Sequence, residues 1–151
     1  MTINRLTWGV KASLRSYVQG AGGSIALDDG ATQTDDGTFV FSAVPGGDLV
    51  IEADGSATGS MRFQGTVSFD AHGGMLKATL AELGVEAGDD GLVLTVKDAH
   101  LPDNRCAIAD LNIVDAGADV TTLGAQITID GMYQIADNYP PGTELDPVRL
   151  D

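Results

Sequence analysis

Two side chains in this sequence, Tyr17 and His72, could perform the chemistry of a functional site. Tyr17 lies in the run Ser-Tyr-Val-Gln-Gly on the apolar face of an expected helix, and His72 follows an expected strand in Asp-Ala-His-Gly-Gly. Histidine is the usual proton-transfer group near neutral pH, and the glycines beside it let another group approach closely. Taken singly, each residue also has an ordinary interpretation. Tyr17 would be a core aromatic whose hydroxyl finds a partner, and His72 a turn residue bonded to backbone.

The other reactive side chains favour structural roles. Cys106 falls in the apolar run Cys-Ala-Ile-Ala, which is typical of a buried, unreactive thiol, and His100 precedes Leu-Pro in a polar loop. Because Cys106 is the only cysteine, the chain has no internal disulfide framework and no multi-cysteine metal site. Tyr133 and Tyr139 lie near the C-terminus and are candidates for the wall of a pocket. Common phosphate-binding and serine-nucleophile motifs are absent from the sequence.

A helix and a strand must position Tyr17 and His72. The helix is expected within residues 7–19, with Thr7 capping its first turn and Gly20 closing its end. Apolar residues recur there at helical spacing, namely Leu6, Val10, Leu14, Tyr17 and Val18. The strand is expected over Met61–Phe69, where apolar and polar residues alternate, and His72 comes just past its end.

Alternation and turn chemistry predict the fold class. Asp-Gly pairs, a strong signal for tight hairpins, recur at 29–30, 36–37, 54–55, 90–91 and 130–131. Period-two alternation also marks the segments around Phe39, Leu94 and Ile127, and Ile129 is expected to continue the pattern of Ile127. Residues 137–147, by contrast, suggest an irregular tail. We therefore expect a mainly β domain, an antiparallel sandwich or barrel-like sheet with one or two short helices.

Composition limits the classes of partner. The 151 residues fit one domain, 1–151, and carry a net charge of −14, which argues against nucleic acid and anionic lipid as partners. The acidic residues fit a solvated surface, and no calcium-loop spacing is present. No stretch is long enough for insertion into a membrane, and no signal peptide is visible. The expected location is cytoplasmic if Met1 is the native start, and exported or at the cell surface if a signal was trimmed.

Three motifs in order resemble the HtaA-type domain of actinobacterial haem-uptake proteins. They are residues 6–18 (LTWGVKASLRSYV), 63–76 (FQGTVSFDAHGGML) and 139–148 (YPPGTELDPV). The resemblance extends from Leu6 to Leu150. It implies a mostly β domain with short helices that holds one haem.

The resemblance also implies roles for individual residues. In that family a tyrosine of the first helix ligates the iron and a histidine after the central strand hydrogen-bonds to it, and these positions match Tyr17 and His72. A tyrosine oxygen suits ferric iron, and the histidine would stabilise the anion by donating a hydrogen bond to it. The family also stacks a phenylalanine on the porphyrin. No phenylalanine follows Phe69 here, so Tyr139 is the expected substitute. The candidate cations for the haem propionates are Lys11, Arg15, Arg62 and Lys77.

The expected function is therefore a module that captures or relays haem through a tyrosinate ligand and catalyses nothing. One alternative is a cofactor-free isomerase, cyclase or dehydratase that uses Tyr17 and His72 as an acid–base pair on an apolar small molecule. Another is a structural or interaction domain with an empty groove. A homodimer is a further expectation. Haem titration separates the first interpretation from the others.

Overall fold

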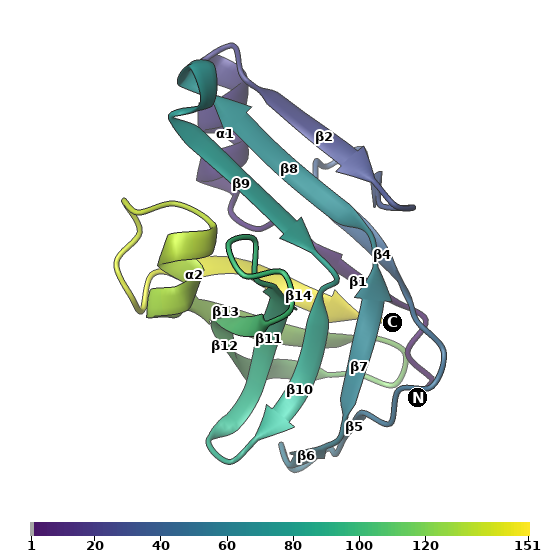
Figure 1. The fold of residues 1–151 in the computed structure, drawn as a ribbon. Helices are drawn as coiled ribbons and strands as arrows, with labels where there is room; N and C mark the ends of the chain where they lie inside the picture. The colour runs from purple at the N-terminus through teal and green to yellow at the C-terminus, as the bar shows by residue number, and fades with distance from the viewer. Residues whose placement is uncertain (1) are drawn as a thin grey trace.

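Eight antiparallel strands form a barrel-like sheet in this computed structural model, which describes residues 2–151 (Figure 1). The sheet runs in the order β1-β14-β13-β12-β11-β10-β7-β4 and closes through pairing of β1 with β4, while β3 adds a short strand beyond β4. Its strands are β1 (Arg5–Trp8), β3 (Thr32–Gln33), β4 (Phe39–Ala43), β7 (Ser60–Gln64), β10 (Gly84–Gly88), β11 (Gly91–Lys97), β12 (Arg105–Ala116), β13 (Thr121–Ile127) and β14 (Glu144–Leu150). The expected mainly β, antiparallel fold class is confirmed.

A second, three-stranded sheet crosses one end of the barrel, with helix α1 packed against it (Figure 1). It consists of β2 (Ser24–Asp28), β8 (Thr66–Ala71) and β9 (Leu76–Ala81), and α1 spans Ala12–Gly20. The 3-10 turn η1 (His72–Gly74) joins β8 to β9, and helix α2 (Ile129–Gln134) packs against β12. A small hairpin of β5 (Val50–Ile51) and β6 (Ala57–Thr58) completes the elements. No helix among residues 2–151 has the length and apolar character to cross a bilayer.

The two sheets share one core. The rings of Phe39 in β4 and Phe69 in β8 meet edge to face with centroids 5.9 Å apart, and both are fully buried. Trp8, Phe41 and Phe63 are buried beside them, and each such side chain contributes about 1.5–3 kcal/mol through removal from water.

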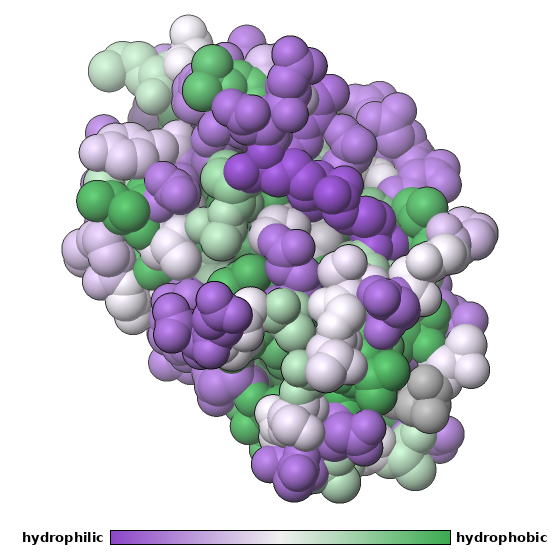
Figure 2. All heavy atoms as spheres, turned by 60° about the horizontal axis from the view of Figure 1, so that its bottom comes forward, coloured by the Kyte–Doolittle hydropathy of each residue, from purple (hydrophilic) through white to green (hydrophobic). Residues whose placement is uncertain are grey.

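Figure 2 shows the outer surface from below the barrel, where hydrophilic residues cover most of the face and hydrophobic ones form small separate patches.

The expected single strand Met61–Phe69 is two strands in different sheets. Gly65, with φ of 137°, separates β7 from β8, and a Cβ there would lie 2.7 Å from the ring of Phe41. The alternation continues across Gly65, since Phe63, Val67 and Phe69 are all buried. A break that preserves the alternation leaves no trace in the hydrophobic pattern, which is why the sequence predicted one strand.

The helix begins later than expected. Leu6 and Trp8 belong to β1, where both are buried between β4 and β14, so Thr7 lies in a strand and caps nothing. Val10, at φ of 64°, then redirects the chain into α1. Leu6 and Val10 lie four positions apart, which fits a helix by spacing alone, but pairing with two neighbouring strands decides the conformation of Leu6.

Three expectations for the C-terminal part of the chain are wrong. Asp130 and Gly131 lie inside α2 rather than in a hairpin turn, because Thr128 caps that helix through a bond from the Gly131 amide to its hydroxyl (2.9 Å). Ile129 accordingly is exposed rather than continuing the buried face of β13. The expected irregular segment 137–147 also ends in β14, which begins at Glu144. By contrast, the hairpin predicted at 90–91 is present between β10 and β11, with Asp89 and Asp90 as its loop and Gly91 paired with Gly88.

Candidate functional site

Tyr17 and His72 meet although 55 positions separate them. The Tyr17 hydroxyl and Nε2 of His72 lie 2.5 Å apart and share a hydrogen bond, and the ring centroids are 5.4 Å apart with the planes inclined by 58°. Tyr17 is 52% exposed, so its hydroxyl is open to a ligand, contrary to a buried core role. The fold therefore places an accessible phenol against an imidazole.

Helix α1 carries Tyr17 beside the residues that face the core. Leu14 and Val18 bury the helix against the core. The N-cap residue of α1 is Lys11, whose side chain makes no capping bond. The carboxylate of Asp146 in β14 supplies the cap instead. Its Oδ1 accepts a hydrogen bond from the Ala12 amide at 3.0 Å, and its Oδ2 pairs with Nη1 of Arg15 at 2.7 Å. This carboxylate fixes the start of the helix that carries Tyr17.

The turn η1 holds His72 in a left-handed backbone conformation. His72 has φ of 53°, and Gly73 and Gly74 follow with φ of 65° and 96°. A non-glycine residue in this region costs roughly 1–3 kcal/mol and persists where surrounding structure fixes it. The hydrogen bond to Tyr17 is one such constraint. Three left-handed residues in succession turn the chain from β8 into β9 and direct the imidazole toward α1.

A pocket of about 340 Å³ surrounds the pair. Its lining combines apolar and polar side chains: Leu14, Tyr17, His72, Met75, Leu76, Asp137, Asn138 and Tyr139. Tyr139, expected as a pocket wall, is therefore placed beside Tyr17 and His72. The Lys11 ammonium lies 5.7 Å from the Tyr139 ring centroid and donates to the Glu144 carbonyl at 2.8 Å.

Several of these lining residues were not predicted from the sequence. Met75 and Leu76 directly follow the histidine turn, and Asp137 and Asn138 directly precede Tyr139. Their positions next to the selected residues were the available signal. It carries little weight without the fold, because neighbours along a turn can point either toward a pocket or away from it.

Other suspected residues lie elsewhere. Tyr133, His100 and Cys106 line a separate hollow of about 490 Å³. Burial, with a smaller effect of the charges of Asp98 and Asp130, raises the pKa of the Cys106 thiol to about 11, so the thiolate is disfavoured. Across residues 2–151, no group of three or more potential metal-binding side chains is present.

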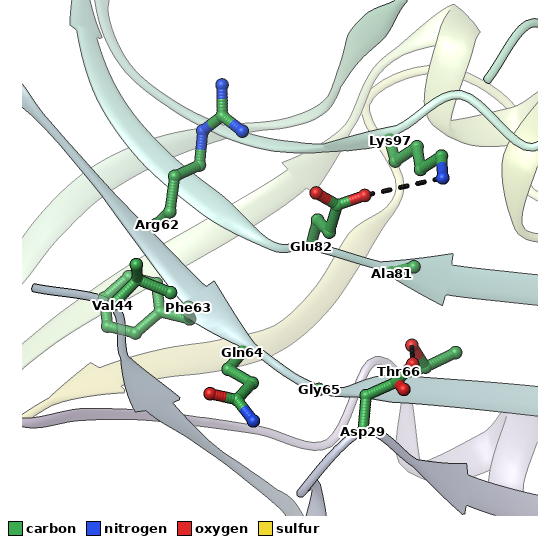
Figure 3. A pocket seen from close by; sticks show the side chains of 10 residues that line it. All are labelled: Asp29, Val44, Arg62, Phe63, Gln64, Gly65, Thr66, Ala81, Glu82 and Lys97. Atoms are coloured by element: carbon green, nitrogen blue, oxygen red, sulfur yellow. Dashed lines mark hydrogen bonds and ion pairs between the residues drawn. The ribbon is translucent and has the colours of Figure 1, made fainter. Parts of the chain in front are cut away.

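Among the four candidate cations, Lys11 places its ammonium over the ring of Tyr139, a wall residue of the pocket. Arg15 is committed to Asp146. Arg62 lines a different hollow of about 500 Å³, where β7 passes into β8 and the Lys97–Glu82 pair spans 3.7 Å (Figure 3). Lys77 lies on β9 outside the set of lining residues.

Chemically, the Tyr17–His72 pair offers one oxygen and one nitrogen that can exchange a proton, beside the apolar side chains of the pocket. A phenol with a neighbouring imidazole can act as a ligand oxygen whose charge the imidazole stabilises, or as half of an acid–base pair. Asp137 and Asn138 add polar atoms at the rim. The geometry alone is compatible with both kinds of chemistry.

Comparison with known proteins identifies the relatives of this chain. The family model HtaA, described as Htaa, matches residues 4–151. The C-terminal domain of HtaA from Corynebacterium glutamicum is similar at 28% identity and a TM-score of 0.71, covering 98% of this chain and 95% of that one. The N-terminal domain of the same protein shares the fold at 24% identity and a TM-score of 0.75, with 99% and 96% covered.

A third solved structure with the same fold is the haem-binding protein HtaB from Corynebacterium glutamicum, at 15% identity and a TM-score of 0.68, with 98% and 91% covered. No curated protein matches the chain significantly. The family model covers nearly the whole sequence and the fold agrees with solved HtaA domains, so the chain belongs to the HtaA family.

Proposed function

We propose that the chain binds haem in the pocket of Tyr17, with the Tyr17 oxygen as iron ligand and Nε2–H of His72 donating a hydrogen bond to that oxygen. The observation that carries the proposal is the 2.5 Å approach of the two atoms in an accessible pocket. Family membership and the haem-binding neighbour HtaB support the same conclusion.

The donor set fits haem. Bound haem would supply a ferric iron, for which a phenolate is a suitable hard oxygen donor. A free phenol ionises only near pH 10, so the phenolate needs a neighbouring donor, and His72 is within reach of that oxygen. Leu14 and Leu76 supply apolar wall, and the exposed side of Tyr17 leaves an approach for a large flat ligand.

Tyr139 and Lys11 complete the proposed binding surface. Tyr139 packs against the core on one side and lines the pocket on the other, so its ring is a wall available for stacking. The Lys11 ammonium next to that ring would meet a propionate carboxylate at the pocket edge. Such a pocket, open at one side, suits capture or relay of haem. A homodimer and the compartment stay predictions.

A second candidate function rests on the same pair. The short contact and the accessible hydroxyl also suit general acid–base catalysis by a cofactor-free lyase or isomerase acting on an apolar small molecule. Tyr17 and His72 would then exchange the proton. If this second function holds, replacement of either residue leaves haem binding unchanged.

Hemin titration followed by absorption tests the proposal. Wild-type protein should give a shifted Soret band at micromolar hemin, and Tyr17→Phe should lose both affinity and the phenolate-to-iron charge-transfer band. His72→Ala should weaken binding by about 10–100-fold, the usual effect of losing a residue that hydrogen-bonds to a metal ligand. The matched controls are Tyr133→Phe and His100→Ala, which alter residues of the separate hollow and should bind like wild type. A wild-type spectrum unchanged by hemin refutes the proposal and favours the enzyme.

A further inference from the structure

Met75 is an exposed apolar side chain at the edge of the Tyr17 pocket. It is 90% exposed, yet it lines the pocket together with Leu14 and Leu76. The other described methionines, Met61 and Met132, are both partly buried. A lone exposed apolar residue is ordinary on a protein surface. One placed at the edge of a ligand pocket has surface that a bound molecule can cover.

The turn that carries Met75 has open space beside its two glycines. Met75 immediately follows η1, and a Cβ added at Gly73 or Gly74 would meet no atom within 4 Å. The two glycines therefore have no close neighbours on that side. Methionine itself has three rotatable side-chain bonds and a polarisable sulfur, which suit it to the face or edge of an aromatic system.

Two other wall residues, Tyr139 and Leu14, are more buried than Met75. Tyr139 is partly buried against the core, and Lys11, which lies near its ring, is tied to the Glu144 carbonyl. Leu14 belongs to α1 and is buried. Met75 is thus the most exposed of the apolar wall residues, and the rotatable bonds of methionine let such a side chain adjust to a ligand.

We propose that Met75 packs its thioether side chain against the face of a bound porphyrin and covers it from water. The inference rests on the proposed haem function and adds a ligand-contacting residue to it. The contact is apolar, made with the macrocycle, and the sulfur does not ligate the metal. Removal of apolar area from water gives the contact its strength.

NMR with gallium(III) protoporphyrin IX, a diamagnetic probe, tests the contact directly. In protein labelled with ¹³C at the methionine methyl groups, the ring current of the bound porphyrin should shift the Met75 methyl signal strongly upfield. The signals of Met61 and Met132 should stay in place, and Met75→Leu identifies the Met75 signal. Porphyrin binding without a shift of Met75 overturns this inference and leaves the proposed function standing. Failure of both porphyrin and hemin to bind overturns both.

Affinity measurements separate apolar packing from metal ligation. Met75→Ala should weaken binding of hemin and of the gallium porphyrin alike by about tenfold, from the lost apolar area. Met75→Leu keeps most of that area without sulfur and should bind within about threefold of wild type. The matched control Met132→Leu, outside the pocket, should not change affinity. A loss with Met75→Leu as large as that with Met75→Ala contradicts the apolar contact.

Discussion

Replacement of Asp146 by alanine should destabilise the protein more than loss of any surface ion pair. Its carboxylate accepts the Ala12 amide at the start of α1 and pairs with Arg15, and both side chains are largely buried, at 23% and 14% exposure. Loss of a helix cap costs about 1 kcal/mol. Leaving the guanidinium without its charged partner adds about 1–2 kcal/mol. We expect a total of about 2–3 kcal/mol, equivalent to roughly 4–12 °C in Tm for a chain of this size.

Urea unfolding followed by circular dichroism measures this loss. Asp146→Asn keeps one oxygen that can accept the Ala12 amide and should recover the cap, about 1 kcal/mol, but not the charge. The matched control is Asp151→Ala, which removes the partner of Arg5 in a pair where Arg5 is 58% exposed, and it should cost about 0–1 kcal/mol. If Asp146→Ala unfolds at the same urea concentration as Asp151→Ala, the anchoring of α1 by this carboxylate is refuted.

Three further experiments test other parts of the fold. Gly65→Ala should destabilise the protein by about 3 kcal/mol or more, because its Cβ would collide with Phe41 and its φ is left-handed. Gly73→Ala lies in open space and should cost about 1 kcal/mol from backbone strain alone. Thermal melts compare the two variants. Hydrogen bonds from two threonines lower the pKa of Asp36 to about 2. The difference in Tm between wild type and Asp36→Ala should therefore be largest above pH 3.8, and it should vanish as the pH falls through about 2. Cys106 should react with iodoacetamide at neutral pH far more slowly than a free thiol, since its pKa is raised to about 11, and fast labelling of the native protein would contradict this.

The fold class follows from local features of the sequence. Asp-Gly pairs and period-two alternation require many short strands with tight turns, and the buried faces at Phe39, Phe41 and Leu94 lie where the alternation predicted them. The identities of Tyr17 and His72 as the candidate pair also came from the sequence, through its three motifs. These properties are local, since each depends on residues a few positions apart.

How these elements are divided and joined depends on contacts between distant segments of the chain. The alternation runs unbroken past Gly65, so the pattern cannot show that the chain leaves one sheet for another there. Leu6 fits a helix and a strand equally by spacing, and its pairing with Phe41 and Leu150 selects the strand. Both decisions depend on partners that are distant in sequence.

The candidate site depends on such distant partners throughout. Tyr17 meets His72 across 55 positions, and Asp146 caps the helix of Tyr17 across 134. Met75 joins the pocket because a turn of left-handed residues brings it to the edge, and no periodicity in the sequence indicates this position. Residue types limit the chemistry that is available. Which atoms come within bonding distance is set by the packing of two sheets around one core, because contacts between distant segments form only when the whole chain is folded.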